Sequence, residues 1–356
     1  MSFDQAFQEL ADYSERAQDF VADTREISMG LTVVGEEPRI SGIGDTGMMM
    51  SRMFEDRFIG INSNGHRQIA QRMGIDWKYY QRCLKDAPWL LTKNVNWWLD
   101  HEPKKLMFRA MDRNLRALLS SKYRRIDNVN VMSAALPHLE KNDYKLTSAQ
   151  ISPDSMVIRA IVGDPKELKQ IGDIAQRGIR IRNSEVGYGA FVVEPFVRIL
   201  SCLNGMTMED SRIRRQHIGT ELDAGLLSST TVAADDSVFL MKAGDMIDAF
   251  ADESQFDSFW YAIETAGSSK LDSPVAACQV LGKTANLSKD ETYGVTNEFM
   301  RAADPTVWGL VQALTAFAHK GDMGEDENMD RRAELESAAG SIVMNQQTCA
   351  ALAQAA

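Results

Sequence analysis

Two arginines alternate with isoleucines at Ile179, Arg180, Ile181 and Arg182, which is the pattern of a β-strand. Successive side chains of a strand point to opposite faces, so we expect the two guanidinium groups to lie in a row on one face of a sheet. Guanidinium groups bind phosphates through paired hydrogen bonds. The pattern therefore predicts an anion-binding face, although arginines buried against carboxylates would have the same spacing.

More cations and aromatic rings flank this strand in the sequence. Residues 104–125 hold eight Lys and Arg against a single acidic residue, and further arginines follow at 212–215. Guanidinium groups that follow phosphates, with rings that stack on bases, are what a sequence-tolerant groove for single-stranded nucleic acid requires. We predict nucleic-acid-binding roles for Arg109, Arg113, Arg116, Lys122, Tyr123, Arg124, Arg125, Arg180, Arg182, Tyr188, Arg198, Arg212, Arg214 and Arg215.

Other chemistry has little support. The sequence lacks a phosphate-binding Gly-rich loop with Lys-Ser/Thr, a His-Glu-x-x-His, a Cys-x-x-Cys and a Gly-x-Ser-x-Gly, so we assign no catalytic residue, metal or cofactor. Cys202 and His217 could be imagined as nucleophile and base, but Cys202 lies in an apolar run, where a thiol is inert. A metal-dependent nuclease stays an alternative, because the carboxylates of Asp164, Asp173 and Glu185 near the basic strands could hold Mg²⁺.

Strand patterns and turn residues predict a central sheet that could present these side chains. Two apolar runs within 144–164 flank the turn at 152–155, and two more cover 176–183 and 188–203. This gives about four largely antiparallel strands. We expect residues 104–125 before them to form a helix with a basic face.

Helical patterns dominate the two ends of the chain. Apolar spacing predicts a helix within 2–29 that starts at Ser2, and 62–86 has a helix-turn-helix cadence with Gly74 closing one helix and Asp76 capping the next. The second helix also carries Lys78, Arg82 and Lys85. This pair of helices could therefore recognise DNA, or it could be a plain helical hairpin. Further helices are expected at 236–251, 253–266, 274–287, 304–318 and 331–352.

These elements predict an α+β fold, with a central antiparallel sheet, a helical N-terminal region and an all-helical C-terminal lobe. We expect three parts: the helical region 1–103, the basic α+β core 104–220 and the acidic lobe 221–356. The net charge of −11 is unevenly spread, since 104–217 carries 20 Lys and Arg against 12 Asp and Glu, whereas 218–356 carries 8 against 22. The positive middle favours an anionic partner there.

Localisation follows from composition. No apolar run approaches the roughly 18 residues of a membrane span, and the first residues are acidic rather than basic and apolar, so we expect a cytoplasmic protein without membrane contact. The four cysteines are far apart in apolar or helical contexts, which favours reduced and buried thiols.

Six motifs follow one another along the chain: GHRQIAQRMGI (65–75), RALLSSKYRRIDN (116–128), GIRIRNSEVGYGAF (178–191), RILSCLNGM (198–206), RRQHIG (214–219) and WGLVQALTAFAH (308–319). In this order they resemble the phage/plasmid-like proteins of domain-of-unknown-function family 932, over about residues 62 to 345. The resemblance implies a protein of the bacterial host cytoplasm that works beside mobile-element DNA functions, and it supplies no catalytic residues.

The charge pattern and the resemblance together predict a protein that binds single-stranded DNA, as a homo-oligomer, to support recombination, annealing or replication of a phage or mobile element. One alternative is an anti-defence or regulatory protein that binds a host or phage protein through acidic, DNA-mimicking surfaces. The metal-dependent nuclease is the second alternative.

Overall fold

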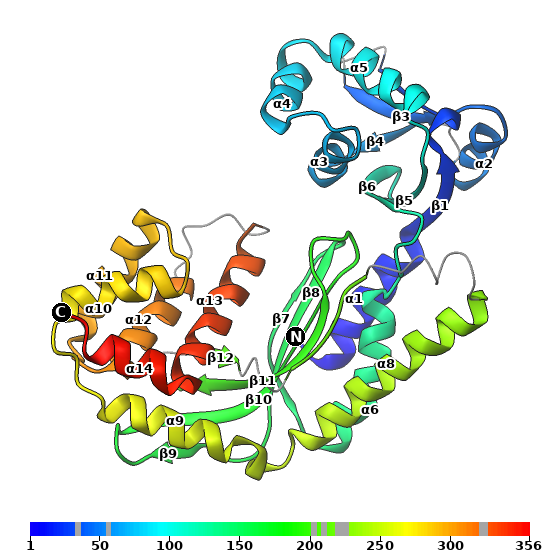
Figure 1. Ribbon diagram of the computed structural model, residues 1–356. Helices are drawn as coiled ribbons and strands as arrows, with labels where there is room; N and C mark the ends of the chain where they lie inside the picture. Colours follow the sequence, from blue (N-terminus) through cyan, green and yellow to red (C-terminus); the bar gives the residue numbers. More distant parts are fainter. Residues whose placement is uncertain (33–36, 55–57, 201–204, 208–211, 218–227, 320–326) are drawn as a thin grey trace.

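The computed structural model describes residues 1–32, 37–54, 58–200, 205–207, 212–217, 228–319 and 327–356 (Figure 1). Within these residues the strands form a six-stranded sheet and a seven-stranded sheet, with helices around both. The α+β class is therefore confirmed, but the central sheet expected to have about four strands has seven. The N-terminal region, expected to be helical, also holds a six-stranded sheet of its own.

The six-stranded sheet has the order β1-β5-β6-β4-β3-β2 and is antiparallel except for the parallel pair β4 and β6. We call this sheet and its helices the N-terminal lobe (residues 17–120). Its strands are β1 Ala17–Asp23, β2 Ile27–Leu31, β3 Pro38–Gly42, β4 Phe58–Ile61, β5 Lys105–Met111 and β6 Asn114–Ser120. Its helices are η1 Thr24–Glu26, α2 Gly44–Phe54, α3 Ser63–Arg72, α4 Trp77–Asp86 and α5 Pro88–His101.

The segment 104–125 is a β-hairpin, so the helix expected there is wrong. Asp112 and Arg113 form its two-residue turn with φ of 50° and 62°, the backbone geometry that hairpin turns favour. All of β5 after Lys105 is buried, since α3 and α5 pack on the N-terminal sheet and Val186, in the loop after β10, packs on the hairpin. A strand buried on both faces lacks the alternation of polar and apolar residues by which a strand is recognised in a sequence. Its apolar residues then fit the spacing of a helix equally well.

The helix-turn-helix cadence is confirmed by α3 and α4. Asn62 caps α3 by accepting a hydrogen bond from the N–H of Gly65 at 2.7 Å. Gly74 turns the chain with φ +66°, and Asp76 caps α4 by accepting from the N–H of Tyr79 at 3.0 Å. Local capping chemistry thus sets both helix starts.

The first helix is shorter than expected. Helix α1 (Phe3–Arg16) starts at Ser2, where Ser2 and Gln5 form a capping box. It ends at Arg16 because the chain passes directly into β1, which pairs antiparallel with β5 from Ala17↔Met111 to Asp23↔Lys105.

The seven-stranded sheet contains the expected antiparallel meander. Strand β10 lies at its centre, between β8 and β11, and its twelve residues make it the longest described strand of the sheet. The strands are β7 Lys145–Ile151, β8 Ser155–Ile161, β9 Lys166–Leu168, β10 Asp173–Ser184, β11 Phe191–Ile199, β12 Gly205–Thr207 and β13 Ile213–Arg215.

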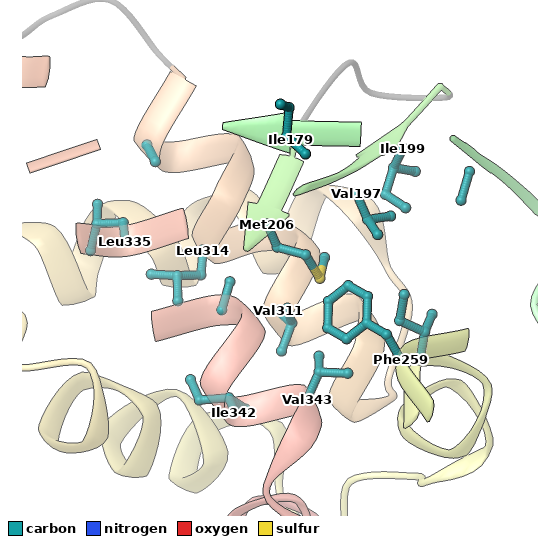
Figure 2. Packing of buried hydrophobic residues seen from close by; sticks show 14 of the residues in the cluster. Ile179, Val197, Ile199, Met206, Phe259, Val311, Leu314, Leu335, Ile342 and Val343 are labelled. Carbon is teal, nitrogen blue, oxygen red and sulfur yellow. The ribbon is translucent and has the colours of Figure 1, made fainter. Parts of the chain in front are cut away.

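Helices cover this sheet. Helix α6 (Asn128–Lys141) packs against α1 and against α8 (Ser229–Ala249). Figure 2 shows the other part of the core, where Val197, Ile199 and Met206 pack toward Phe259 and Val343 of the C-terminal helices. These helices are η3 Glu253–Phe256, α9 Asp257–Ser268, α10 Pro274–Thr284, α11 Lys289–Ala302, α12 Val307–His319, α13 Glu327–Met344 and α14 Gln346–Ala353. None of the described helices has the length and apolar character needed to cross a membrane.

Candidate functional site

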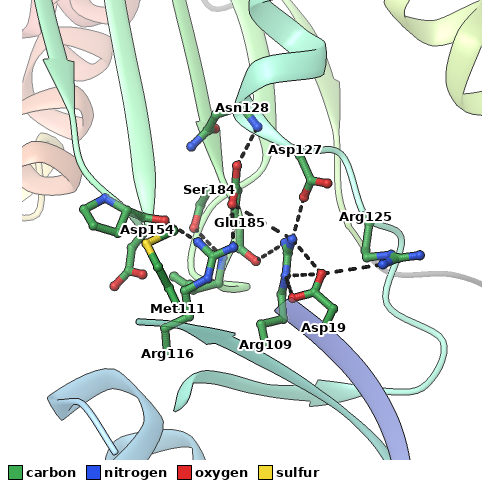
Figure 3. Close-up of polar contacts among 12 residues, drawn as sticks. Asp19, Arg109, Met111, Arg116, Arg125, Asp127, Asn128, Asp154, Ser184 and Glu185 are labelled. Carbon is green, nitrogen blue, oxygen red and sulfur yellow. Dashed lines mark hydrogen bonds and ion pairs between the residues drawn. The ribbon is translucent and has the colours of Figure 1, made fainter. Parts of the chain in front are cut away.

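Charged side chains join the N-terminal lobe to the seven-stranded sheet (Figure 3). The Glu185 carboxylate accepts hydrogen bonds from Nη2 of Arg116 and from the backbone N–H of Asn128, both at 2.7 Å. Its carbonyl oxygen accepts from Nη1 of Arg109 at 2.8 Å. Because Arg109 lies on β5 and Arg116 on β6, these bonds hold the loop after β10 against both strands of the hairpin.

Arg109 is enclosed by carboxylates. Its Nη2 lies 2.9 Å from Oδ2 of Asp19 and 2.6 Å from Oδ1 of Asp127, and its side chain is 2% exposed. Burial alone would lower the pKa of Arg109, but Asp127, Asp19 and Glu185 raise it above its ordinary value. Arg109 is therefore a buried and compensated charge rather than a surface cation.

The loop after β10 is also fixed by uncharged contacts. The Gln68 side chain donates to the carbonyl of Val186 and accepts from the N–H of Leu118, each at 2.6 Å. Gly187 has φ +85°, and a Cβ there would lie 2.7 Å from Cδ2 of Leu119. The conformation favours glycine, and any larger residue would also require the Leu119 side chain to shift.

A second buried network fastens the C-terminal helices to β10. Arg180 is fully buried, donates from Nε to Glu194 at 2.9 Å and pairs with Glu336 of α13. Glu336 also accepts from Nη2 of Arg159 at 3.0 Å and lies 3.0 Å from Nε2 of His319. Two buried arginines thus share one carboxylate from the C-terminal lobe.

Between the N-terminal lobe and the seven-stranded sheet lies a cleft of about 1010 Å³. It is lined by the start of α3, one face of α4, the tip of the β5–β6 hairpin, the β7–β8 turn, and the end of β10 with the loop after it. The volume is at the upper end of the roughly 300–1,000 Å³ typical of ligand pockets. The cleft can therefore hold a ligand of several rings.

Aromatic and cationic side chains meet in the cleft. The Arg67 guanidinium lies 5.6 Å from the centre of the Trp77 ring, in a cation–π arrangement. Tyr188 is 44% exposed. Its partial burial raises its pKa above the ordinary value, although the nearby Arg67 acts in the opposite direction. Arg182, whose Nε is 3.6 Å from Glu194, lines the same cleft. Two rings and two guanidinium groups thus surround one space.

Carboxylates are also present in the cleft wall. Asp112 and Asp154 line it, and Asp112 lies 3.5 Å from Nη2 of Arg16. Arg116 lines the cleft as well, but its side chain is 2% exposed and paired with Glu185. The accessible positive charge of the cleft therefore comes from the exposed Arg67 and, in part, from Arg182, whose side chain is 21% exposed beside Glu194.

Most of residues 183–190, the NSEVGYGA segment, line the cleft. No family model, curated protein or solved structure matches this chain. The resemblance to phage and plasmid proteins therefore stays a prediction. The geometry of the cleft itself is what points to a function.

Three predicted binding residues line the cleft, namely Arg116, Arg182 and Tyr188. The expectation that Arg180 lies beside Arg182 on an open sheet face is wrong. The register does alternate as expected, but α13 covers Arg180 with Glu336, which is 156 residues away in the sequence. The sequence pattern of a strand does not reveal which helix covers its face.

Other predicted residues hold elements together. Nη1 of Arg124 lies 2.7 Å from Asp235, its Nη2 lies 2.8 Å from Asp236, and Arg215 pairs with the same two carboxylates of α8. The ring of Tyr123 stacks on His217 with centroids 5.2 Å apart. These contacts attach α8 and β13 to the segment that follows β6, so Tyr123, Arg124 and Arg215 are not open surface residues.

The remaining predicted residues lie elsewhere. Arg125 is exposed and 3.6 Å from Asp19, and the exposed Arg113 forms the hairpin turn. Arg214 is exposed on β13. None of the following is among the described residues that line the cleft: Arg113, Lys122, Arg125, Arg198, Arg212 and Arg214.

Sequence reasoning missed Arg67 and Trp77. A signal existed, because the buried residues His66, Ile69 and Ala70 define the inner face of α3 and leave Arg67 on the outer face. Trp77 then follows at the first position of α4. Their meeting depends on the angle between the two helices, which the sequence does not give.

The described residues offer no metal site for the nuclease alternative. Among the described residues, no group of three or more His, Cys, Asp or Glu could hold a metal ion. Asp173 and Glu185 are not neighbours, because Asp173 starts β10 and accepts from Nε1 of Trp308 at 2.8 Å, whereas Glu185 follows the far end of that strand. Cys202 lies outside the described residues, while Cys83, Cys278 and Cys349 are buried free thiols.

Proposed function

We propose that this protein binds single-stranded DNA in the cleft between its N-terminal lobe and its seven-stranded sheet. The observation that carries the proposal is the convergence of Trp77 and Tyr188 with Arg67 and Arg182 around one space. The Tyr188 ring, 44% exposed, provides a stacking face for a base, Trp77 holds the Arg67 guanidinium over its own ring, and guanidinium groups pair with phosphates.

The arrangement favours unpaired bases over a duplex. In a duplex the faces of the bases are covered by their neighbours, whereas a single strand leaves them open to aromatic side chains. The phosphate contacts and ring faces carry little sequence information, so we expect binding with weak sequence preference. The motif resemblance, whose NSEVGYGA segment lines the cleft, supports a role beside mobile-element DNA in recombination, annealing or replication.

The test is fluorescence anisotropy with a labelled single-stranded oligonucleotide and its duplex across a salt series. Each phosphate contact adds about −0.7 to the slope of log K against log salt for a single strand, so Arg67→Ala and Arg182→Ala should each flatten the slope by about 0.7. Tyr188→Ala should cost about 1–3 kcal/mol of binding free energy through lost stacking.

Matched controls lie on α11. Arg301→Ala removes an exposed arginine that pairs with Glu298, and Tyr293→Ala removes a ring that is 71% exposed. Neither change should alter binding. Absence of binding at low salt, or equal losses in the controls and the cleft variants, would refute the proposal.

The two alternatives are separate outcomes of the same work. Adding Mg²⁺ or Mn²⁺ to the binding samples would reveal cleavage if the protein were a nuclease. A stoichiometric host protein recovered from lysate, together with no oligonucleotide binding, would favour the anti-defence or regulatory role.

A further inference from the structure

Helix α4 presents cations next to the residues that line the cleft. Lys78, Arg82 and Lys85 are exposed and are spaced three or four residues apart, so they share one face of the helix. Trp77 and Gln81 of the same helix line the cleft. The basic face of α4 therefore adjoins the cleft.

Helix α5 carries an exposed aromatic row. Trp89, Lys93 and Trp97 follow at four-residue spacing, and the two tryptophans are 55% and 50% exposed. Nζ of Lys93 lies 5.5 Å from the centre of the Trp89 ring, and Trp97 stacks on His101 with centroids 4.1 Å apart. Each ring thus has a neighbour on its own helix while about half of the residue stays exposed, and exposed apolar groups of this size mark an interaction surface.

A series of contacts connects the two helices. Helix α4, which carries Tyr79 at 43% exposure, packs against α5, which carries Asn94. Oδ1 of Asn94 accepts from Nε1 of Trp98 at 3.1 Å, and Trp98 meets Trp97 edge to face with centroids 4.6 Å apart. The basic face of α4 and the aromatic row of α5 therefore form one surface.

We define the α4–α5 surface by Lys78, Tyr79, Arg82, Lys85, Trp89, Lys93 and Trp97. The acidic residues on these helices and at the start of α4 are Asp76, Asp86 and Asp100, of which Asp76 is engaged as the cap of α4. Four cations interleaved with three rings complement the phosphates and bases of a nucleic-acid strand.

We propose that a single strand bound in the cleft continues over the α4–α5 surface, where Trp89 and Trp97 stack on bases and the cations follow the phosphates. This inference rests on the proposed function of the cleft and extends its binding site. The two tryptophans are eight residues apart, about 12 Å along the helix, which spaces them for different bases of one strand.

The experiment compares short and long oligothymidylates, of about six and about twenty nucleotides, by anisotropy on the full chain. The Trp89→Ala/Trp97→Ala double variant should bind the long oligonucleotide at least about tenfold more weakly than wild type does. Its affinity for the short oligonucleotide should stay within about twofold of wild type. The Lys78→Ala/Lys93→Ala variant should flatten the slope of log K against log salt by about 1.4 for the long oligonucleotide. The slope for the short oligonucleotide should not change.

The control is Tyr261→Ala/Tyr293→Ala, which removes two exposed rings of the C-terminal helices, 67% and 71% exposed. If both oligonucleotides bind and the tryptophan variant matches this control, the extended path is refuted while binding in the cleft stands. If neither oligonucleotide binds to the wild-type chain, the proposed function fails and the extended path fails with it.

Discussion

Replacing Glu336 by glutamine should destabilise the protein strongly. Glu336 is completely buried and is the carboxylate that Arg159 and Arg180 share, with His319 beside it. The amide keeps the shape but removes the negative charge between two buried guanidinium groups. Removing one partner of such a buried pair costs about 3–5 kcal/mol, a large part of the roughly 5–15 kcal/mol that holds a domain folded.

The assay is thermal unfolding beside a matched control on the same helix. For a domain of about 150–250 residues, 1 kcal/mol corresponds to roughly 2–4 °C, so a loss of about 3 kcal/mol should lower the melting temperature by about 6–12 °C. Glu334→Gln is the control, because Glu334 is 65% exposed and its ion pair with Arg331 contributes about 0–1 kcal/mol at most. Equal melting temperatures for the two variants would refute the reasoning.

The pH dependence gives a second readout of the same prediction. Burial alone would raise the pKa of Glu336, but Arg159, the hydrogen bond from His319, and Arg180 hold it well below its ordinary value. A lowered pKa in the folded state stabilises the fold above the ordinary pKa of about 4.3, and this stabilisation is lost as the pH falls toward the lowered value. The difference in melting temperature between wild type and Glu336→Gln should therefore be constant from about pH 7 to 5 and narrow below about pH 4.

Two other predictions concern the loop after β10 and the thiols. Gly187→Ala should lower the melting temperature more than Gly172→Ala, because both glycines have positive φ but only at Gly187 would a Cβ meet a neighbour, Leu119 at 2.7 Å; equal shifts would contradict the packing argument. Burial raises the pKa of the Cys278 and Cys349 thiols, so Ellman's reagent should modify them slowly in the native protein and quickly in urea. Fast native labelling of both, located by mass spectrometry, would show that their burial is not maintained.

The sequence predicted the elements whose signals are local. The α3–α4 pair was predictable from Gly74 and Asp76, and the meander of the second sheet from its turn residues and alternation. The β5–β6 hairpin was not, because packing on both faces removes the alternation of polar and apolar residues.

The site was predictable only in part for a related reason. Arginine on a strand has the same sequence pattern whether it lines a cleft, as Arg182 does, or faces a glutamate of a distant helix, as Arg180 does. Arg67 and Trp77 meet through the packing angle of two helices. Whether an arginine is buried or lines the cleft therefore depends on contacts between residues far apart in the chain.

The bond between Arg116 and Glu185 also bears on the order in which the molecule folds. The two residues are separated by 69 positions, so the hairpin that carries Arg116 is synthesised well before the loop that neutralises it. During this interval the guanidinium lacks its carboxylate, and contacts this distant in sequence form slowly. The contacts of Arg116 are therefore complete only when the loop after β10 has docked on the hairpin, and the same docking brings together the two walls of the cleft.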